Sequence, residues 1–327
     1  MSKTAIIGIS CLFPEANSPE KYYENLLQNK DCTSLMQENQ LFEDPKKYFH
    51  PQKGQVDKYY NMRGGFIHDF KLDTTDFAVD CDYLEQLDDI HQWSLYVARE
   101  ALRDSGYLEQ VDVLNRCGVV LGNLSFPTKT SNQLCIPIYH NAIQKQLNAK
   151  VPDPGISFHN KTPDQVHLDN LRIGGYPAML IQQALRLSNI AFSIDSACAT
   201  SLYSIKLAID YLEAGKADMM LAGAVSAADP FFISTGFSIF QAYSDKDLSC
   251  PLDKRSGGLT SGEGAGMVLL KRYAAAVRDN DQIYAVIEGV GLSNDGSGKF
   301  ILVPSSEGQV LALNRAYEMS GVKTSEV

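Results

Sequence analysis

The sequence predicts an α/β fold with a largely parallel sheet. Short apolar runs of strand length recur along the chain, and amphipathic stretches of helix length separate most of them. Strands that alternate with helices in this way favour a sheet covered by helices. The chain has 327 residues, of which 44% are hydrophobic and 21% charged, so it is long enough for two domains or for one large α/β domain.

Six strands are predicted from apolar runs that are rich in β-branched residues or bounded by turn residues. They cover residues 4–13, 117–126, 189–195, 217–227, 264–271 and 283–293. The segment from about 30 to 85 is polar and aromatic, and it is predicted to be a surface excursion outside the core. The segment 127–170 has a mixed composition that predicts no particular element.

Five helices are predicted from apolar periodicity and from residues that favour helix ends. The first has Ser18 as its N-cap and Pro19 at its first position, where proline is tolerated. The others cover 91–106, 177–187, the stretch from Ala199 to Gly215, and 307–321.

Composition and charge exclude several classes of protein. The count of 29 basic against 39 acidic residues gives a net charge of −10, whereas a nucleic-acid binder needs a basic face. No apolar run is long enough for a membrane span, and the N-terminus lacks the features of a signal peptide. The seven cysteines lack a C-x-x-C pair, which is typical of free thiols in a reducing cytosol. We therefore expect a cytoplasmic protein with no metal site and no binding to nucleic acid or membrane.

Cys198 lies in the stretch FSIDSACATSLYSIKLAIDYLEAG (192–215), between a predicted strand and a helix predicted to begin one residue later. The first N–H groups of a helix have no partner within it, and a thiol beside them ionises more easily. The small neighbours Ala197, Ala199 and Thr200 leave room for a substrate. A buried cysteine that fills space explains the same pattern. Local sequence leaves the nucleophile and the packing residue as equal alternatives.

The glycine-rich stretch SGEGAG (261–266) precedes an apolar run instead of joining a strand to a helix. A dinucleotide-binding loop needs the second arrangement, so these glycines are predicted to allow close backbone packing at a buried turn.

None of the six histidines follows Cys198 in the sequence. A papain-like order, with the histidine downstream of the cysteine, is therefore excluded. A cysteine hydrolase that uses His140, His159 or His167 from upstream is left as an alternative.

Four motifs in a fixed order carry a family resemblance. They are AIIGISCLFP at the start, DSACATSLYSIKLA around Cys198, DMMLAGAV after it, and CPLDKRSGGLTSGEGAGMVLLKR over 250–272. With them the chain resembles the N-terminal part of a β-ketoacyl synthase of the thiolase fold. DKYYNMRGGFIHDF, LGNLSFPTKTSNQLCIPIYH and ADPFFISTGFSIFQAYSD are similar to the ketosynthases of bacterial polyunsaturated fatty acid synthases. LDDIHQW (87–93) departs from the L-D-P-Q-Q-R of modular ketosynthases, which favours this narrower group.

The resemblance implies a layered α/β/α fold built from two similar halves. We expect residues 1–272 to form the complete N-terminal ketosynthase half and residues 273–327 to begin the C-terminal half. The family's H-[GA]-T-G-T histidine would follow shortly after residue 327, so the chain looks truncated before the catalytic histidines. A fragment of a longer synthase is favoured over one part of a split protein or a degenerate member kept for binding. Such a chain should expose an apolar sheet face and helix sides that the missing half would cover, and it should be poorly soluble or self-associate.

The resemblance also implies the chemistry, which is a decarboxylative Claisen condensation in fatty acid or polyketide biosynthesis. Cys198 would accept an acyl chain from the phosphopantetheine arm of an acyl carrier protein, and malonyl-carrier protein would supply the carbanion. No cofactor of its own is expected, because the phosphopantetheine arrives on the carrier. This chain alone would acylate itself at most, because the histidines needed for decarboxylation are missing from it.

The alternative function is a non-catalytic partner, like a chain-length factor, that offers a dimer surface and part of an acyl tunnel. The strand 189–195 would pair across the axis of a homodimer or of a ketosynthase/chain-length-factor heterodimer within a larger synthase. Phe231, Phe237 and Phe240, together with Phe232, are candidates to line the acyl channel, although aromatic residues at such spacing are more often plain core. Lys145, Lys150 and Lys161 are candidates for a basic patch that docks an acidic carrier protein.

Overall fold

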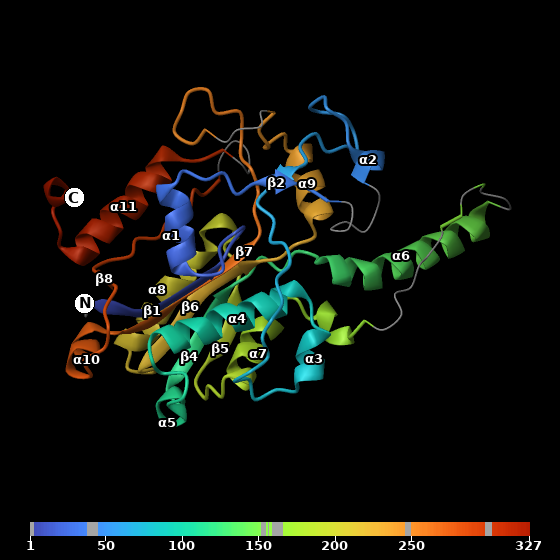
Figure 1. Cartoon of the computed structure of the whole chain (residues 1–327). Helices are drawn as coiled ribbons and strands as arrows, with labels where there is room; N and C mark the ends of the chain where they lie inside the picture. Colours follow the sequence, from blue (N-terminus) through green and yellow to red (C-terminus); the bar gives the residue numbers. More distant parts are fainter. Residues whose placement is uncertain are drawn as a thin grey trace.

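A mixed sheet of six strands forms the centre of the molecule, in the order β5-β4-β6-β7-β1-β8 (Figure 1). The computed structural model describes residues 3–37, 45–151, 155, 157–158, 166–245, 250–297 and 303–327. The strands are β1 Thr4–Leu12, β4 Cys117–Gly122, β5 Ala191–Ile194, β6 Met219–Ser226, β7 Gly264–Arg272 and β8 Ala285–Ile287. β4 is parallel to β5 and β6, while β7 is antiparallel to both β6 and β1. The α/β prediction is confirmed, and β7 and β8 are the antiparallel members of the sheet.

The helices of the described residues include each of the five that the sequence predicts. They are α1 Pro19–Leu27, α2 Pro45–Tyr48, α3 Cys81–Glu85, α4 Asp89–Asp104, α5 Val111–Leu114, α6 Lys129–Lys150, α7 Tyr176–Ala184, α8 Thr200–Glu213, α9 Pro230–Ile239, α10 Tyr273–Arg278 and α11 Ser306–Ser320. Ser18 caps α1 as predicted, because its hydroxyl accepts a hydrogen bond from the Lys21 N–H. Gly321 ends α11 in the left-handed conformation at φ 69°.

Alternate residues of the central strands bury their side chains in two separate layers. Val119, Leu221 and Leu269 point into the layer shared with α4 and α7. Val120 and Leu270, one residue further along their strands, point into the layer shared with α8. Because the side-chain period of a strand is two, both faces of a sheet covered by helices must be apolar. This arrangement gives the three layers of the predicted α/β/α fold, with α4 and α7 on one side of the sheet and α8 on the other (Figure 1).

The prediction that residues 30–85 form a surface excursion is wrong for several side chains. Tyr59 is fully buried, and Phe66 and Leu72 are each 5% exposed. A two-stranded sheet lies in the same segment, with β2 over Ser34–Leu35 and β3 over Arg63–Gly64. The burial of these residues could not be predicted, because they are isolated apolar side chains in a polar segment and follow neither a helix nor a strand period.

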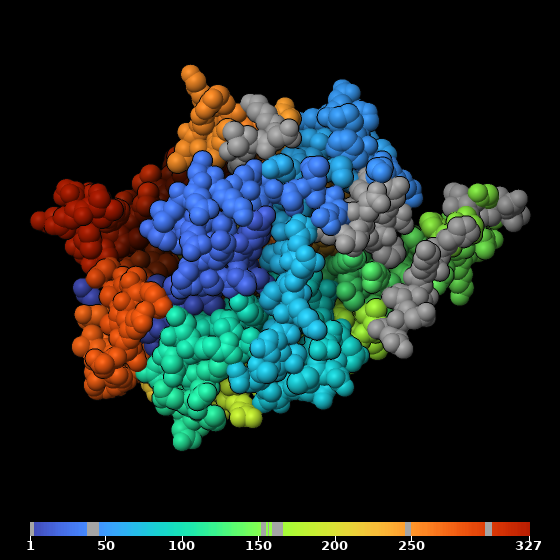
Figure 2. Space-filling model, in the orientation of Figure 1, coloured from blue at the N-terminus to red at the C-terminus, as the bar shows by residue number. Residues whose placement is uncertain are grey.

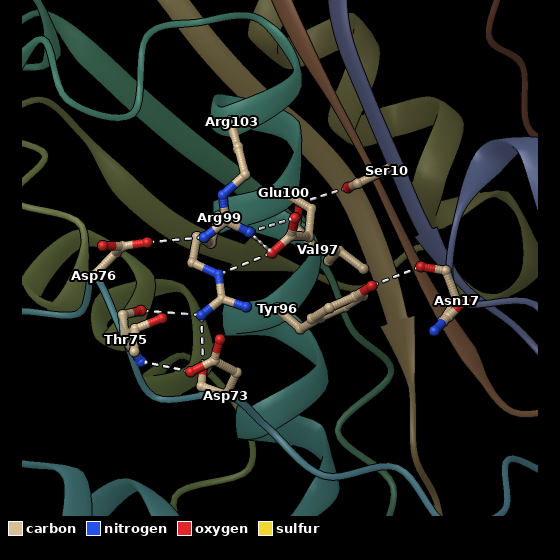
Figure 3. A network of polar contacts seen from close by, with 10 residues as sticks. All are labelled: Ser10, Asn17, Asp73, Thr75, Asp76, Tyr96, Val97, Arg99, Glu100 and Arg103. Atoms are coloured by element: carbon tan, nitrogen blue, oxygen red, sulfur yellow. Dashed lines mark hydrogen bonds and ion pairs between the residues drawn. The ribbon is translucent and has the colours of Figure 1, made fainter.

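Arg99 of α4 holds the last part of this segment against the helix (Figure 3). Its side chain is 2% exposed, and its guanidinium donates hydrogen bonds to the carbonyls of Asp73 and Thr75. The next turn of α4 adds an ion pair of 2.8 Å between Arg103 and Asp76. Since a buried guanidinium needs acceptors for its donors, these carbonyls fix the path of the chain over 73–76.

Helix α6 was missed by the sequence prediction and extends away from the sheet (Figures 1 and 2). Thr128 and Ser131 cap it reciprocally, since each side chain bonds the backbone N–H of the other. Its described buried residues are Ser131 and Pro137, so the helix lacks the apolar stripe from which helices are predicted.

The strand predicted over 283–293 pairs with β1 for three residues only, as β8. The backbone beyond β8 turns to α11 for its contacts. Arg315 of α11 donates to the Leu292 carbonyl at 2.6 Å, and the Ser293 hydroxyl donates to the Gly308 carbonyl at 2.6 Å. Gly291 permits this approach, since a Cβ atom there would lie 1.9 Å from the Ala312 carbonyl oxygen.

Several helices expose apolar side chains, as expected from the sequence. Leu27 of α1 is 70% exposed, Leu202 of α8 is 57% exposed and Leu313 of α11 is 59% exposed. These exposed side chains agree with the prediction that the isolated chain self-associates, which stays a prediction for solution. Across the described part of the chain, every helix falls short of the length and apolar character needed to cross a membrane.

Candidate functional site

Cys198 lies at the turn between β5 and α8, with its side chain exposed. A single 3-10 turn, Ala197–Ala199, contains the cysteine, and α8 begins at Thr200. The helix therefore starts one residue later than the sequence predicts. The exposure of Cys198 removes the second alternative at this position, a buried thiol that only fills space.

Short polar contacts hold the turn in this shape. The Asp195 carboxylate accepts from the Ala197 N–H at 2.9 Å, and the Thr200 hydroxyl accepts from the Ser196 N–H at 2.9 Å. The Thr200 hydroxyl also donates to the Ala197 carbonyl. Ala197 has a φ of 49°, a left-handed conformation that is uncommon for a residue with a Cβ atom. The turn thus presents Cys198 on a backbone that its neighbours fix from both sides.

An apolar pocket of 300 Å³ opens beside Cys198, and we call it the Cys198 pocket. Its far walls are apolar and come from several elements, with Phe66, Ile90, Phe126, Ile233, Phe237 and Leu259 among the lining residues. Its polar lining residues are Asn123, Ser226, Thr260, Ser261 and Glu263. Asn123 is 3% exposed, and its side-chain amide donates to the Ile173 carbonyl at 2.6 Å, so this wall is rigid. The pocket can hold an extended apolar group attached near the thiol.

The aromatic residues predicted to line an acyl channel lie in different places. Phe237 borders the Cys198 pocket, where its ring packs on Tyr243 at 5.6 Å. Phe231 packs between the rings of Tyr48 and Tyr59 instead. Phe240 and Phe232 are 48% and 41% exposed. Of these four residues, only Phe237 is among the described residues that line a cavity reaching Cys198.

A larger cleft of 1020 Å³ lies on the other side of Cys198. It runs along the α8 face of the sheet, between α1 and the ends of β1, β6 and β7. Tyr23 and Leu26 of α1 line this cleft and are 61% and 58% exposed. Cys198 therefore borders both an apolar pocket and an open cleft.

Glu263 lines both of these cavities and was missed by the sequence prediction. It belongs to SGEGAG, where only the glycines were interpreted. Close packing holds at Gly264, where a Cβ atom would lie 2.6 Å from the Phe13 ring and 3.0 Å from the Leu12 carbonyl oxygen, whereas Gly262 and Gly266 have no atom closer than 3.5 Å to such a Cβ. The neglected signal was an acidic residue directly before a buried strand. Burial raises the pKa of Glu263 to about 7, and nearby Asp89 and Asp229 act in the same direction.

Replacing Glu263 by glutamine should stabilise the fold at alkaline pH. The folded pKa of about 7 lies above the usual 4.5, so the folded chain binds more protons than the unfolded chain between these values. As the pH rises from about 4.5 to 7, the free energy of unfolding of the wild type therefore falls relative to that of Glu263→Gln. The total difference is up to about 3 kcal/mol. Urea unfolding of both proteins at pH values below and above this window checks the difference. Equal pH dependence of the two proteins would contradict it.

The histidines proposed for a cysteine hydrolase lie away from the thiol. His140 is on α6 and stacks on Phe158 with ring centres 4.5 Å apart. His167 packs edge-on against Tyr83, and its Nδ1 accepts from the Asp169 N–H at 3.2 Å. His159 lies outside the described residues. No histidine is among the described residues that line the Cys198 pocket, so the structure gives no support to the hydrolase alternative.

The remaining predicted site residues and cysteines have simple surroundings. Lys145 and Lys150 are exposed on α6, and Lys161 lies outside the described residues. Burial raises the pKa of Cys11 to about 11 and that of Cys117 to about 12. Cys81 is exposed like Cys198 but begins α3 on a different part of the surface. Over the residues that the structure describes, no cluster of histidine, cysteine and acidic side chains is placed to hold a metal ion.

The sheet order and the strand–turn–helix around the thiol agree with one known family. Residues 1–276 match the family described as β-ketoacyl synthase, N-terminal domain. The chain belongs to this family, and it corresponds to the N-terminal part of the ketosynthases found in fatty acid and polyketide synthases.

Its relatives include components of polyunsaturated fatty acid synthases, which confirms the narrower resemblance. Two different subunits of the polyunsaturated fatty acid synthase of Thraustochytrium sp. are each 31% identical to this chain, one over 300 residues and the other over 338. The matched regions take in 90% and 100% of this chain. The chain spans only 14% and 12% of the length of these two proteins.

Two solved structures show the same fold. The PfaC keto synthase–chain length factor is 50% identical with a TM-score of 0.92, over 99% of this chain and 35% of that one. The ketosynthase from module 6 of the bacillaene synthase of Bacillus subtilis 168 is 27% identical with a TM-score of 0.76. In that case 98% of this chain and 49% of the other are covered.

Proposed function

We propose that this chain is an acyltransferase of the β-ketoacyl synthase type, in which Cys198 accepts an acyl chain from a thioester. The observation that carries the proposal is the exposed thiol at the β5–α8 turn, next to an apolar pocket of 300 Å³. The donor is the phosphopantetheine thioester of an acyl carrier protein, and the chain brings no cofactor of its own. We assign no described residue to the decarboxylation of the malonyl unit or to the condensation step.

Acyl transfer to Cys198 is a balanced exchange of one thioester for another. The thiol gives up its proton, and the sulfur attacks the carbonyl carbon of the donor thioester. A new carbon–sulfur bond forms at Cys198, the bond to the donor sulfur breaks, and the donor leaves as a thiol after taking up a proton. No side chain caps the start of α8, and the positive end of its aligned peptide dipoles favours the negative charge that develops during the attack.

The Cys198 pocket supports an acyl chain as the transferred group. Its apolar wall stabilises alkyl carbons by removing them from water. A methylene group occupies about as much volume as a water molecule, about 30 Å³. The pocket of 300 Å³ therefore has room for up to about ten carbons of the acyl chain. Together with the polyunsaturated fatty acid synthase relatives, this supports a growing fatty acyl chain as the substrate.

The proposal is tested by incubating the chain with octanoyl-N-acetylcysteamine, a thioester that mimics the end of the carrier arm. Mass spectrometry should find the octanoyl group on Cys198, and Cys198→Ala should abolish the adduct. Cys81→Ala is the matched control, because Cys81 is exposed like Cys198 and its loss should leave labelling of Cys198 unchanged. Equal labelling of Cys81 and Cys198 would refute the acyl-acceptor role.

The second candidate function is a non-catalytic partner of a ketosynthase. The similarity to a protein that joins a keto synthase with a chain length factor favours it. The position of β5 also favours it. β5 is the end strand of the sheet, and its outer edge has no neighbouring strand among the described residues. A strand from a partner protein can pair with such an edge. Under this alternative Cys198 stays unmodified in the thioester experiment, while the chain still forms a stable complex with a ketosynthase.

A further inference from the structure

Thr200, the first residue of α8, holds the turn that carries Cys198. Its hydroxyl oxygen accepts a hydrogen bond from the Ser196 N–H at 2.9 Å and donates one to the Ala197 carbonyl. The Thr200 N–H donates to the same carbonyl. Thr200 is 2% exposed, so these bonds lie away from water. A single hydroxyl group therefore ties together the two residues that directly precede the cysteine.

The backbone conformation that these bonds maintain is an unfavourable one for alanine. Ala197 has a φ of 49°, in the left-handed region, and such a conformation persists only where the surroundings hold it. Thr200 holds Ala197 at its carbonyl, and the Asp195 carboxylate holds it at its N–H, at 2.9 Å. Because Ala197 is bonded directly to Cys198, a change in the backbone of Ala197 displaces the thiol.

The methyl group of Thr200 packs on the end of β4, and this contact fixes the direction of the hydroxyl. Gly122 makes room for the methyl group, since a Cβ atom at Gly122 would lie 2.8 Å from the Thr200 Cγ2. The end of β4 also holds β5, because Gly122 pairs with Ile194 and the Asn123 N–H donates to the Ile194 carbonyl at 2.9 Å. Thr200 and the strand that leads to Cys198 thus rest on the same end of β4, where Asn123 lines the Cys198 pocket.

We propose that Thr200 is a positioning residue for acyl transfer, whose hydroxyl holds Ala197 in the left-handed conformation and thereby keeps the Cys198 sulfur aligned with the Cys198 pocket. The inference rests on the proposed function, because it concerns the same acyl transfer. Thr200 acts through the turn and not on the reacting atoms. Without the hydroxyl, the Ser196 N–H loses its acceptor and Ala197 relaxes toward an ordinary backbone conformation. The sulfur then leaves the geometry in which it meets the carbonyl carbon of a thioester whose acyl chain lies in the pocket.

The test measures two rates at Cys198 by mass spectrometry, acylation by octanoyl-N-acetylcysteamine and alkylation by iodoacetamide. Thr200→Val keeps the shape of the side chain but loses the hydroxyl, so its acylation rate should fall about 10- to 100-fold. Thr200→Ala should be slow for the same reason, whereas Thr200→Ser keeps the hydroxyl and should recover most of the wild-type rate. Iodoacetamide is small and needs an exposed thiol without alignment to the pocket. Its rate should therefore stay at the wild-type value in all three variants.

Thr4→Val is the matched control for the loss of a buried threonine hydroxyl. Thr4 begins β1 and is 1% exposed, and its hydroxyl has no hydrogen-bond partner among the described residues, so this variant should acylate like the wild type.

Three results would overturn the role of Thr200 and leave Cys198 as the acyl acceptor. The first is a wild-type acylation rate in Thr200→Val or Thr200→Ala. The second is an equal fall of acylation and alkylation, which would place the effect on the thiol itself and not on its alignment. The third is a Thr200→Ser protein as slow as Thr200→Val although both unfold at the wild-type temperature. A wild-type chain that never acylates Cys198 would instead overturn the proposed function.

Discussion

Gly223→Ala should destabilise the chain more than most other single substitutions. Gly223 lies in the middle of β6, and a Cβ atom there would stand 2.0 Å from the carbonyl oxygen of Gly266 on β7. The obstacle is backbone of a central strand, so no side chain can rotate away. The α8 face offers no relief either, because Ser204 donates to the Gly223 carbonyl at 2.9 Å. We expect a loss of about 4 kcal/mol or more in the free energy of unfolding, measured by urea titration.

Gly236→Ala is the matched control for this substitution. Gly236 lies inside α9, and a Cβ atom there would meet no heavy atom within 4 Å. Alanine is the better helix former by about 1 kcal/mol, so the control should be neutral or slightly stabilising. A Gly223→Ala protein as stable as the Gly236→Ala protein would show that β6 and β7 can separate at little cost.

Lys271→Met should cost about 3–5 kcal/mol, because it leaves a buried carboxylate without its cation. The Lys271 side chain is 5% exposed, and its ammonium lies 2.7 Å from Asp281 and 2.8 Å from Asp279. Tyr107 completes the group, since Lys271 donates to its hydroxyl at 2.7 Å and the hydroxyl donates to Asp281 at 2.6 Å. Burial lowers the pKa of Lys271, but hydrogen bonds to Asp279, Asp281 and Tyr107 outweigh it and raise the pKa to about 12. Urea unfolding at neutral pH measures the loss.

The double variant Lys271→Met, Asp281→Leu shows whether the isolated charge is the cause. Removing both partners leaves no buried charge unpaired, so the double variant should be more stable than Lys271→Met alone. Asp279 has a side chain 34% exposed, so water can satisfy it when Lys271 is absent. If Asp281→Leu makes the single variant still less stable, the lysine does not act through its pairing with Asp281.

Most of the fold could be predicted because its core elements carry periodic apolar patterns. The continuous apolar run over 217–227 and the helical spacing of apolar residues in α8 are visible in the sequence, and both elements lie where expected. α6 was missed because its stability comes from reciprocal caps and not from an apolar stripe. β8 was predicted too long, because an apolar run does not show whether its residues will pair with another strand or pack against a helix such as α11.

The candidate site was predictable at Cys198 and less so around it. The strand–turn–helix pattern and the ordered motifs pointed to the cysteine, whereas its exposure depends on how the turn at Ala197 folds. Of the aromatic candidates only Phe237 lines the pocket. This could not be predicted, because the sequence does not show which face of α9 meets the cavity. Glu263 was missed because its raised pKa depends on burial and on Asp89 and Asp229, which are far away in the sequence or on another element.

The position of β1 has a consequence for how the chain matures during its synthesis. β1 ends at Leu12, yet its partner β7 begins at Gly264 and its other partner β8 begins at Ala285. At a synthesis rate of about 5–20 residues per second, β1 leaves the ribosome roughly ten to fifty seconds before β7 does. During that time both of its edges are open to pairing with other chains. Until β7 and β8 arrive, β1 can be protected only by segments other than its partners in the finished sheet.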